Sequence, residues 1–85
     1  MQGAIAKVEA TIDGILAEYV TTYALMPLQR REAEGGVVTW SSDKEVLVEL
    51  VYGDRQSARV VVREIGLLQP LKKQLRSRRV TVEYK

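Results

Sequence analysis

The chain has 85 residues, of which 46% are hydrophobic and 28% are charged, a composition that is typical of one globular domain and argues against disorder. It contains no cysteine and no histidine, so disulfides, thiol nucleophiles and the commonest zinc sites are excluded. The net charge is only +2, but residues 1–54 carry four basic and nine acidic groups, whereas residues 55–85 carry nine and two. This segregation indicates either an anionic partner for the C-terminal part or attraction between the two halves.

The first 26 residues fit an amphipathic helix, because their large apolar side chains recur at spacings of three and four. These residues are Ile5, Val8, Ile12, Ile15, Leu16, Tyr19, Tyr23 and Met26. The sequence therefore predicts one helix over residues 3–26. The alternative is a strand over residues 4–12, in which small and apolar residues alternate, followed by a helix from residue 13. Pro27 ends either element.

Residues 28–36 are polar and helix-permissive, and Gly35 and Gly36 close this segment as a flexible joint. The apolar period then changes from helical to two. We expect strands over residues 37–41, 45–52 and 56–65, with turns at residues 42–44 and 53–55. A three-residue turn at 53–55 pairs Val48 with Val60 on one face and Glu49 with Arg59 on the other, so the second and third strands form a hairpin supported by ion pairs.

Residues 66–77 return to helical spacing, with leucines 67, 68, 71 and 75 on one side. Pro70 is tolerated in a first turn, which predicts a helix that begins near residues 67–70. Residues 79–84 alternate Val80 and Val82 with polar residues and predict a closing strand. The expected fold of residues 1–85 is a single two-layer α+β domain with an N-terminal helix, a three-stranded antiparallel meander, a second helix and a C-terminal strand. It becomes ferredoxin-like if residues 4–12 form a strand.

The sequence offers few means of catalysis. Without histidine or cysteine, only carboxylate, Lys, Tyr or Ser chemistry remains. The candidate carboxylates Glu45 and Glu49 already have proposed partners in Arg63 and Arg59, and no calcium-loop or phosphate-loop spacing is present. We therefore expect no enzyme activity, no catalytic residue, no metal and no cofactor.

The segment from residue 71 to residue 79 carries five cations and no acid. On a helix these side chains lie away from the leucines, where they are placed either to bind phosphates or simply to face solvent and complement the helix dipole. The nucleic-acid-binding hypothesis rests on Lys72, Lys73, Arg76, Arg78 and Arg79. Aromatic side chains interleaved with the cations, which favour single-strand or RNA recognition, are missing.

The remaining candidate surface is apolar. Tyr19 and Tyr23 lie late in the expected helix, and Leu47, Val51 and Val61 make the ion-paired face of the hairpin partly apolar, so a second layer or another subunit has to cover that face. The leading hypothesis is a small non-catalytic domain that acts by protein–protein contact as a homo-oligomer, with these five residues at the interface. Its partner is itself or another protein. Neither a secretory signal nor a membrane-spanning stretch is seen, which favours the cytoplasm.

Overall fold

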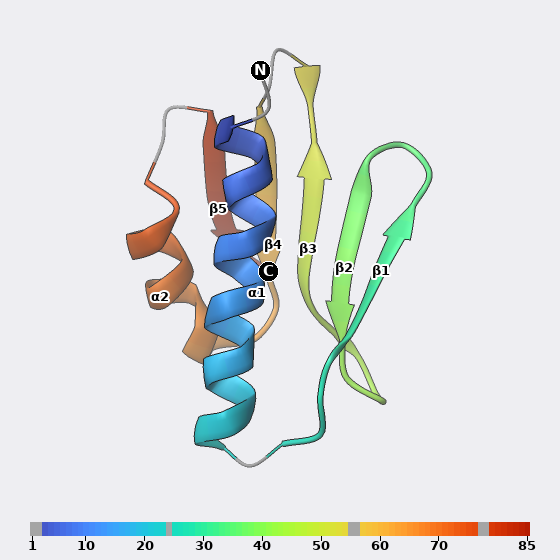
Figure 1. The fold of residues 1–85 in the computed structure, drawn as a ribbon, viewed down its shortest axis with the longest axis vertical. Coiled ribbons are helices and arrows are strands. Elements are labelled where there is room, and N and C mark those ends of the chain that lie inside the picture. Colours follow the sequence, from blue (N-terminus) through green and yellow to red (C-terminus); the bar gives the residue numbers. More distant parts are fainter. Residues whose placement is uncertain (1–2, 24, 55–56, 77–78) are drawn as a thin grey trace.

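The computed structural model describes residues 3–23, 25–54, 57–76 and 79–85. It is an α+β fold with two helices and a five-stranded sheet (Figure 1). In chain order the elements are α1 (Gly3–Thr22), β1 (Gln29–Ala33), β2 (Val37–Ser41), β3 (Val46–Tyr52), β4 (Ala58–Val62), α2 (Ile65–Gln74) and β5 (Val80–Tyr84). The expected α+β class, the N-terminal helix, the second helix and the closing strand are confirmed.

Helix α1 covers residues 4–12, so the strand that would have made the fold ferredoxin-like does not form. Its inner stripe, Val8, Ile12 and Leu16, is almost completely buried, as helical spacing predicts. The helix ends at Thr22, four residues earlier than expected, and the Tyr23 N–H closes its last turn on the Tyr19 carbonyl at 3.1 Å. Pro27 lacks the N–H that a further turn would need.

The expectation for residues 28–36 was wrong. Gln29–Ala33 form β1, which pairs antiparallel with β2, so the meander has four strands and not three. Every residue of β1 is exposed, which explains why no apolar alternation marks it. Gly35 and Gly36 have φ values of 83° and 74°, and these left-handed conformations make the pair a hairpin turn rather than a loose joint.

The register of β3 and β4 differs from the expected one by two residues. Val48 lies opposite Val62, and Glu49 lies opposite Val61. The connection runs from Gly53 to Ser57: the Gly53 N–H donates to the Ser57 carbonyl at 2.8 Å, which closes a longer loop than the three residues assumed. A shift of two leaves the paired side chains of both strands on their predicted faces but removes the predicted ion pairs. Arg59 instead pairs with Glu83 of β5, at 3.3 Å.

Helix α2 begins at Ile65, earlier than the expected residues 67–70, and Pro70 lies in its second turn. Glu64 caps the helix: its carboxylate accepts from the Gly66 N–H at 3.4 Å, and its carbonyl accepts from the Leu67 N–H at 2.9 Å. Pro70 removes only the hydrogen bond to the Gly66 carbonyl. Since Gly66 is exposed, solvent can reach that carbonyl, and the helix tolerates the proline.

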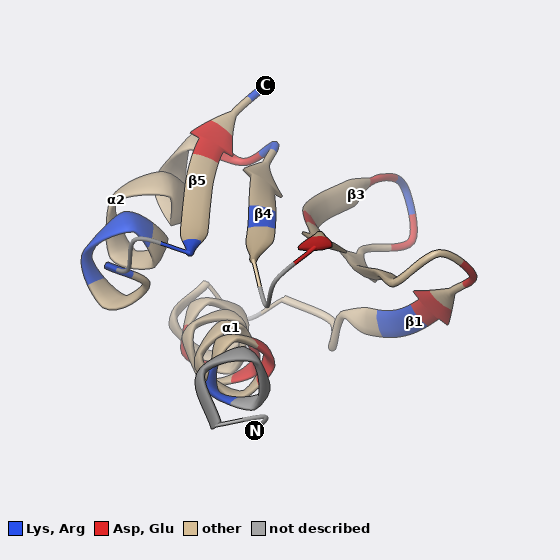
Figure 2. Ribbon diagram, turned by 90° about the horizontal axis from the view of Figure 1, so that it is seen from above, with Lys and Arg blue, Asp and Glu red and all other residues tan. Residues whose placement is uncertain are grey.

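Both helices cover the same face of the sheet (Figures 1 and 2). The chain crosses from β4 through α2 to β5, which therefore lies parallel to β4 at the sheet edge. Apolar residues of α1, α2 and the central strands form one core cluster between the layers. Its members are Val8, Ile12, Leu16, Val38, Trp40, Leu47, Val48, Leu50, Ala58, Val60, Val62, Leu67, Leu71 and Leu75. No helix of the described residues lies over the opposite face of the sheet.

Candidate functional site

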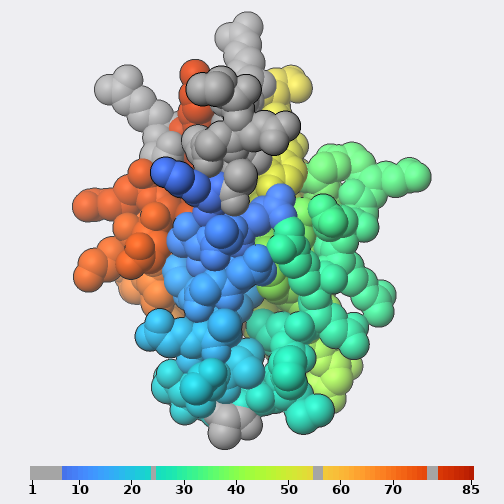
Figure 3. All heavy atoms as spheres, in the orientation of Figure 1, coloured from blue at the N-terminus to red at the C-terminus, as the bar shows by residue number. Residues whose placement is uncertain are grey.

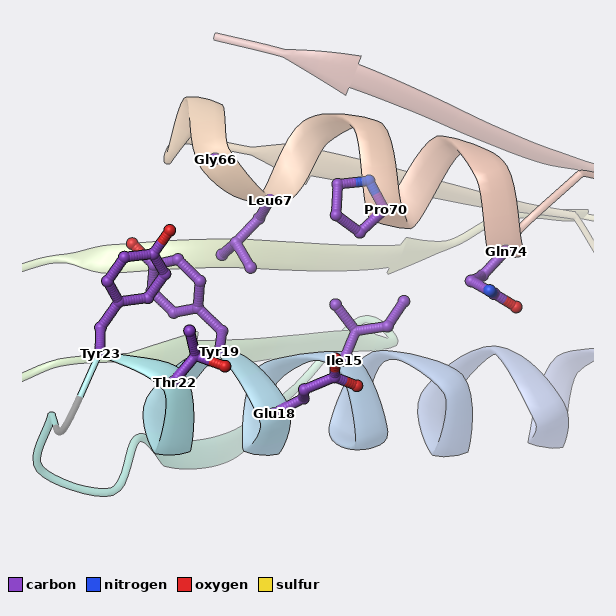
Figure 4. A pocket seen from close by; sticks show the side chains of 9 residues that line it. All are labelled: Ile15, Glu18, Tyr19, Thr22, Tyr23, Gly66, Leu67, Pro70 and Gln74. Carbon is purple, nitrogen blue, oxygen red and sulfur yellow. The ribbon is translucent and has the colours of Figure 1, made fainter.

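A groove of about 310 Å³ lies between α1 and α2 (Figure 4). Both helices contribute to its walls, and its lining residues are Ile15, Glu18, Tyr19, Thr22, Tyr23, Gly66, Leu67, Pro70 and Gln74. The close-up shows both tyrosine rings together at one end of the groove, with Ile15 pointing from α1 toward α2. The expected interface residues Tyr19 and Tyr23 therefore lie in one cavity, next to a helix from which they are more than 40 residues away in sequence.

The two tyrosines differ in their surroundings although their ring centroids are only 4.8 Å apart. Tyr19 is half-buried against the start of α2, and a Cβ atom added at Gly66 would lie 3.7 Å from its ring. Burial, with the nearby Glu64 carboxylate and Tyr23, raises the pKa of Tyr19 above the usual 10.0. Tyr23 is 62% exposed. The pair thus presents one anchored ring and one that solvent surrounds.

Further exposed apolar residues follow Tyr23 where α1 ends. Leu25 and Met26 lie in the connection from α1 to β1, and together with Tyr23 we call these three residues the apolar end. Met26 is 82% exposed and Leu25 is 44% exposed. Large apolar side chains exposed together in this way are typical of interaction sites.

The expected interface residues on the sheet are mostly covered within the subunit. Leu47 is the extra residue of a β-bulge in β3 opposite Trp40 and Ser41, and its side chain is buried in the core cluster. Val61 is only 2% exposed although no helix covers its face of the sheet. Val51 lies on the same face as Val61 and is half-buried, so it is the most accessible of the three expected sheet residues. These residues do not join Tyr19 and Tyr23 in one patch.

The basic residues lie on the outer side of α2 (Figure 2). Lys72, Lys73 and Arg76 are exposed and line a shallow hollow together with Gln69, Pro70 and Gln74. Within the described part of the chain, no ion pair joins these three cations to an acid. Arg79 is also exposed, and its carbonyl accepts the Ala58 N–H at 2.7 Å. Arg78 lies outside the described residues.

A polar network that the sequence did not predict fixes the other side of α1. Arg30 of β1 pairs with Glu9 and with Asp13, the latter at 2.9 Å. The Trp40 indole N–H donates to Asp13 at 2.8 Å, and the Tyr52 hydroxyl donates to Glu9. Arg30 also lies 5.7 Å from the centre of the Trp40 ring. The four-residue spacing of Glu9 and Asp13 indicated a shared helix face, but no sequence signal identified their partners.

Each carboxylate of this network already holds a cation and a neutral donor, so the network connects α1 to β1, β2 and β3. Among the described residues, no group of three His, Cys, Asp or Glu side chains could hold a metal ion. Likewise, none of the helices in the described ranges is long and apolar enough to cross a membrane. The groove and the basic side of α2 are the two surfaces that contain predicted site residues.

Comparisons with protein-family models, with curated proteins and with solved structures found no match.

Proposed function

We propose that this chain is a small non-catalytic interaction domain that acts by protein–protein contact and associates with itself through the groove between α1 and α2. The exposure of Tyr23 carries this proposal, because a tyrosine whose ring is tilted against a neighbouring tyrosine and is left 62% exposed offers a rigid, largely apolar surface for contact. Tyrosine is enriched among the residues that dominate interface energies. The apolar end adds further area next to it.

Charge favours a second copy as the occupant of the groove. The α1 wall carries Glu18, whereas Lys73 lies on the outer side of α2 next to the groove residues Pro70 and Gln74. The other acids of α1, Glu9 and Asp13, are already paired with Arg30. A twofold arrangement that crosses the groove places Glu18 of each copy near the α2 cations of the other, so the same contact forms twice. The acidic first half of the sequence then lies against the basic second half of another copy.

The proposed compartment is the cytoplasm, because a chain without cysteine suits a reducing environment.

Sedimentation equilibrium of the wild type and of Tyr23→Ala tests the proposal. We expect the wild type to associate at micromolar concentration and Tyr23→Ala to bind at least about tenfold more weakly, as for an interface tyrosine that contributes 1.4 kcal/mol or more. Arg31→Ala, which removes a long exposed side chain from β1, is the matched control and leaves association unchanged. A wild type that stays monomeric at these concentrations contradicts the proposal.

The alternative function is nucleic-acid binding, and the exposed cluster of Lys72, Lys73 and Arg76 is the observation in its favour. Fluorescence anisotropy with mixed-sequence RNA and DNA at about 50 and about 200 mM salt tests it, because counterion release makes phosphate binding strongly salt-dependent. Binding that weakens steeply with salt, and that is lost when all three residues are changed to Ala, makes this surface a nucleic-acid site. Absence of binding at low salt leaves it as a solvated helix face.

A further inference from the structure

The outer edge of the sheet at β5 presents backbone groups with no partner in the described part of the chain. β5 pairs only with β4. The Ala58 N–H donates to the Arg79 carbonyl, and the Lys85 N–H donates to the Val62 carbonyl, so the backbone groups of odd-numbered residues point toward β4. Since these directions alternate along a strand, the N–H and C=O groups of Val80, Val82 and Tyr84 point outward. Among the described residues, no hydrogen bond uses these outward groups.

The opposite edge of the sheet is protected against pairing, and the β5 edge is not. All five residues of β1 are exposed, and Arg31 and Glu32 place two charges along that edge, whereas Arg30 is held by Glu9 and Asp13 of α1. Charged side chains of this kind discourage edge-to-edge association. β5 contains one charged residue, Glu83, and its carboxylate is held by Arg59 over the neighbouring strand. The rest of β5 is Val, Thr, Val and Tyr, which are strong strand formers.

Exposed apolar side chains flank the same edge. Tyr84 ends β5 and is 49% exposed. Gly66, Pro70 and Gln74 line the groove, so their side of α2 faces α1. Helical geometry puts Leu68 and Ile65 on the opposite side of α2. Leu68 is half-buried against the core, and Ile65 is largely exposed. The β5 edge therefore combines free backbone groups with apolar area.

We propose that β5 pairs antiparallel with β5 of a second copy, with the two Val82 residues opposite each other. In this register every outward-pointing residue lies opposite an outward-pointing residue of the second copy. The three pairs are Val82 with Val82, Val80 with Tyr84, and Tyr84 with Val80, and each pair exchanges two backbone hydrogen bonds. Val80 and Tyr84 form aliphatic–aromatic cross-strand contacts, which are favourable. Between them Thr81 lies opposite Glu83 of the second copy, and at each end of the pairing the flanking Arg79 comes opposite Lys85 of the other copy.

This contact uses a different surface from the groove and does not depend on it. A chain with both contacts has two separate twofold interfaces, so its assemblies grow beyond a dimer. A chain with only the β5 contact forms a dimer with one continuous sheet. The two proposals can therefore succeed or fail separately, and mass measurements together with cross-linking distinguish them.

Disulfide cross-linking tests the β5 register directly, because the chain has no cysteine of its own. Thr81→Cys and Glu83→Cys chains are prepared separately, mixed and oxidised with a glutathione buffer. The register places residue 81 of one copy opposite residue 83 of the other at a non-hydrogen-bonded pair, where Cβ atoms are close enough for a disulfide. We expect cross-linked dimers in the mixture and few in either chain alone. Arg31→Cys, on the protected edge, mixed with Thr81→Cys is the control and stays uncross-linked.

Val82→Pro gives a second test, because it removes an N–H that points outward and makes no bond to β4. Val82→Ala keeps that N–H and controls for lost packing. We expect Val82→Pro, introduced into both cysteine chains, to lower the cross-link yield at least about tenfold while Val82→Ala does not. A mixture that forms no disulfide, or Thr81→Cys alone cross-linking as efficiently as the mixture, overturns the proposal. If Tyr23→Ala weakens association and the mixture stays uncross-linked, only the groove contact holds; the reverse result leaves only the β5 contact.

Discussion

The two flanks of α1 are built in opposite ways. Toward β1, Glu9 and Asp13 are held by Arg30, Trp40 and Tyr52, so this flank consists of directional polar contacts. Toward α2, Ile15, Tyr19 and Tyr23 line an open groove in which Tyr23 remains largely exposed. In the space-filling view α1 lies between the side chains of α2 and those of β1 (Figure 3).

This difference separates stability from recognition. The polar flank satisfies its donors and acceptors within the subunit, so an outside partner gains nothing there without breaking existing bonds. The groove flank has apolar area that the subunit itself does not cover, so a partner gains free energy by covering it. We therefore expect substitutions on the first flank to lower the free energy of unfolding, and substitutions on the second to change association.

The largest effect comes from removing an aromatic ring on each flank in turn. Trp40 is 3% exposed and belongs to the core cluster, so Trp40→Ala should lower the free energy of unfolding by about 3–5 kcal/mol. Tyr23→Ala removes a ring of similar chemistry from the groove and should cost less than about 0.5 kcal/mol, as surface substitutions do. Urea unfolding followed by circular dichroism, at concentrations where the chain is monomeric, measures both. Equal losses in the two variants would contradict the separation of roles.

A smaller change sharpens the comparison on the polar flank alone. Trp40→Phe keeps a buried ring but removes the indole N–H that donates to Asp13 at 2.8 Å. We expect a loss of about 1 kcal/mol, below the usual range for a charged acceptor because Asp13 is also reached by solvent and keeps Arg30. A double-mutant cycle with Asp13→Ala, which leaves no side-chain acceptor at residue 13, measures the coupling between the two side chains. Additive losses in the cycle would show that the hydrogen bond contributes no coupling.

The smallest effect is a pH dependence in which both flanks take part. Burial is the largest cause that raises the pKa of Tyr19 in the groove and of Tyr52 in the network above 10.0. Both phenols therefore ionise at lower pH in the unfolded chain than in the folded one. Their contribution to stability is fully present below pH 10.0 and is lost as the pH rises through their folded pKa values. Urea unfolding at several pH values above 10.0 should show the free energy of unfolding fall as the pH rises. Tyr19→Phe and Tyr52→Phe should each make this fall less steep.

The elements with a strong local pattern were predictable, and their failures have local causes. Helical spacing over residues 3–26 and alternation in residues 37–41 gave the correct elements, because burial on one face imposes a period on the sequence. β1 was missed because an edge strand with five exposed residues has no such period. The β3–β4 register was wrong by two because the loop length had to be assumed, yet the residues paired between the two strands kept their predicted faces because side chains alternate with a period of two.

The candidate site was less predictable than the fold. Tyr19 and Tyr23 were identified from helical spacing, but their groove also needs Gly66, Leu67 and Pro70, which reach it only because the β4–α2–β5 crossover lays α2 beside α1. Leu47 was placed on the wrong surface because a bulge redirects it into the core cluster. The partners of Glu9 and Asp13 lie on β1 and β2 and could not be identified from α1 alone.

Periodicity and composition were thus sufficient for the type of each strongly patterned element, for the faces of its strands and for the exclusion of thiol and imidazole chemistry, because these properties depend on neighbours within a few residues. The tertiary structure decided the rest: the parallel placement of β5, the groove, the polar network and the exposure of the β1 and β5 edges of the sheet. Each of these depends on which distant segments lie side by side, and that choice is made by the joint burial of the apolar faces of both helices and the central strands in one core.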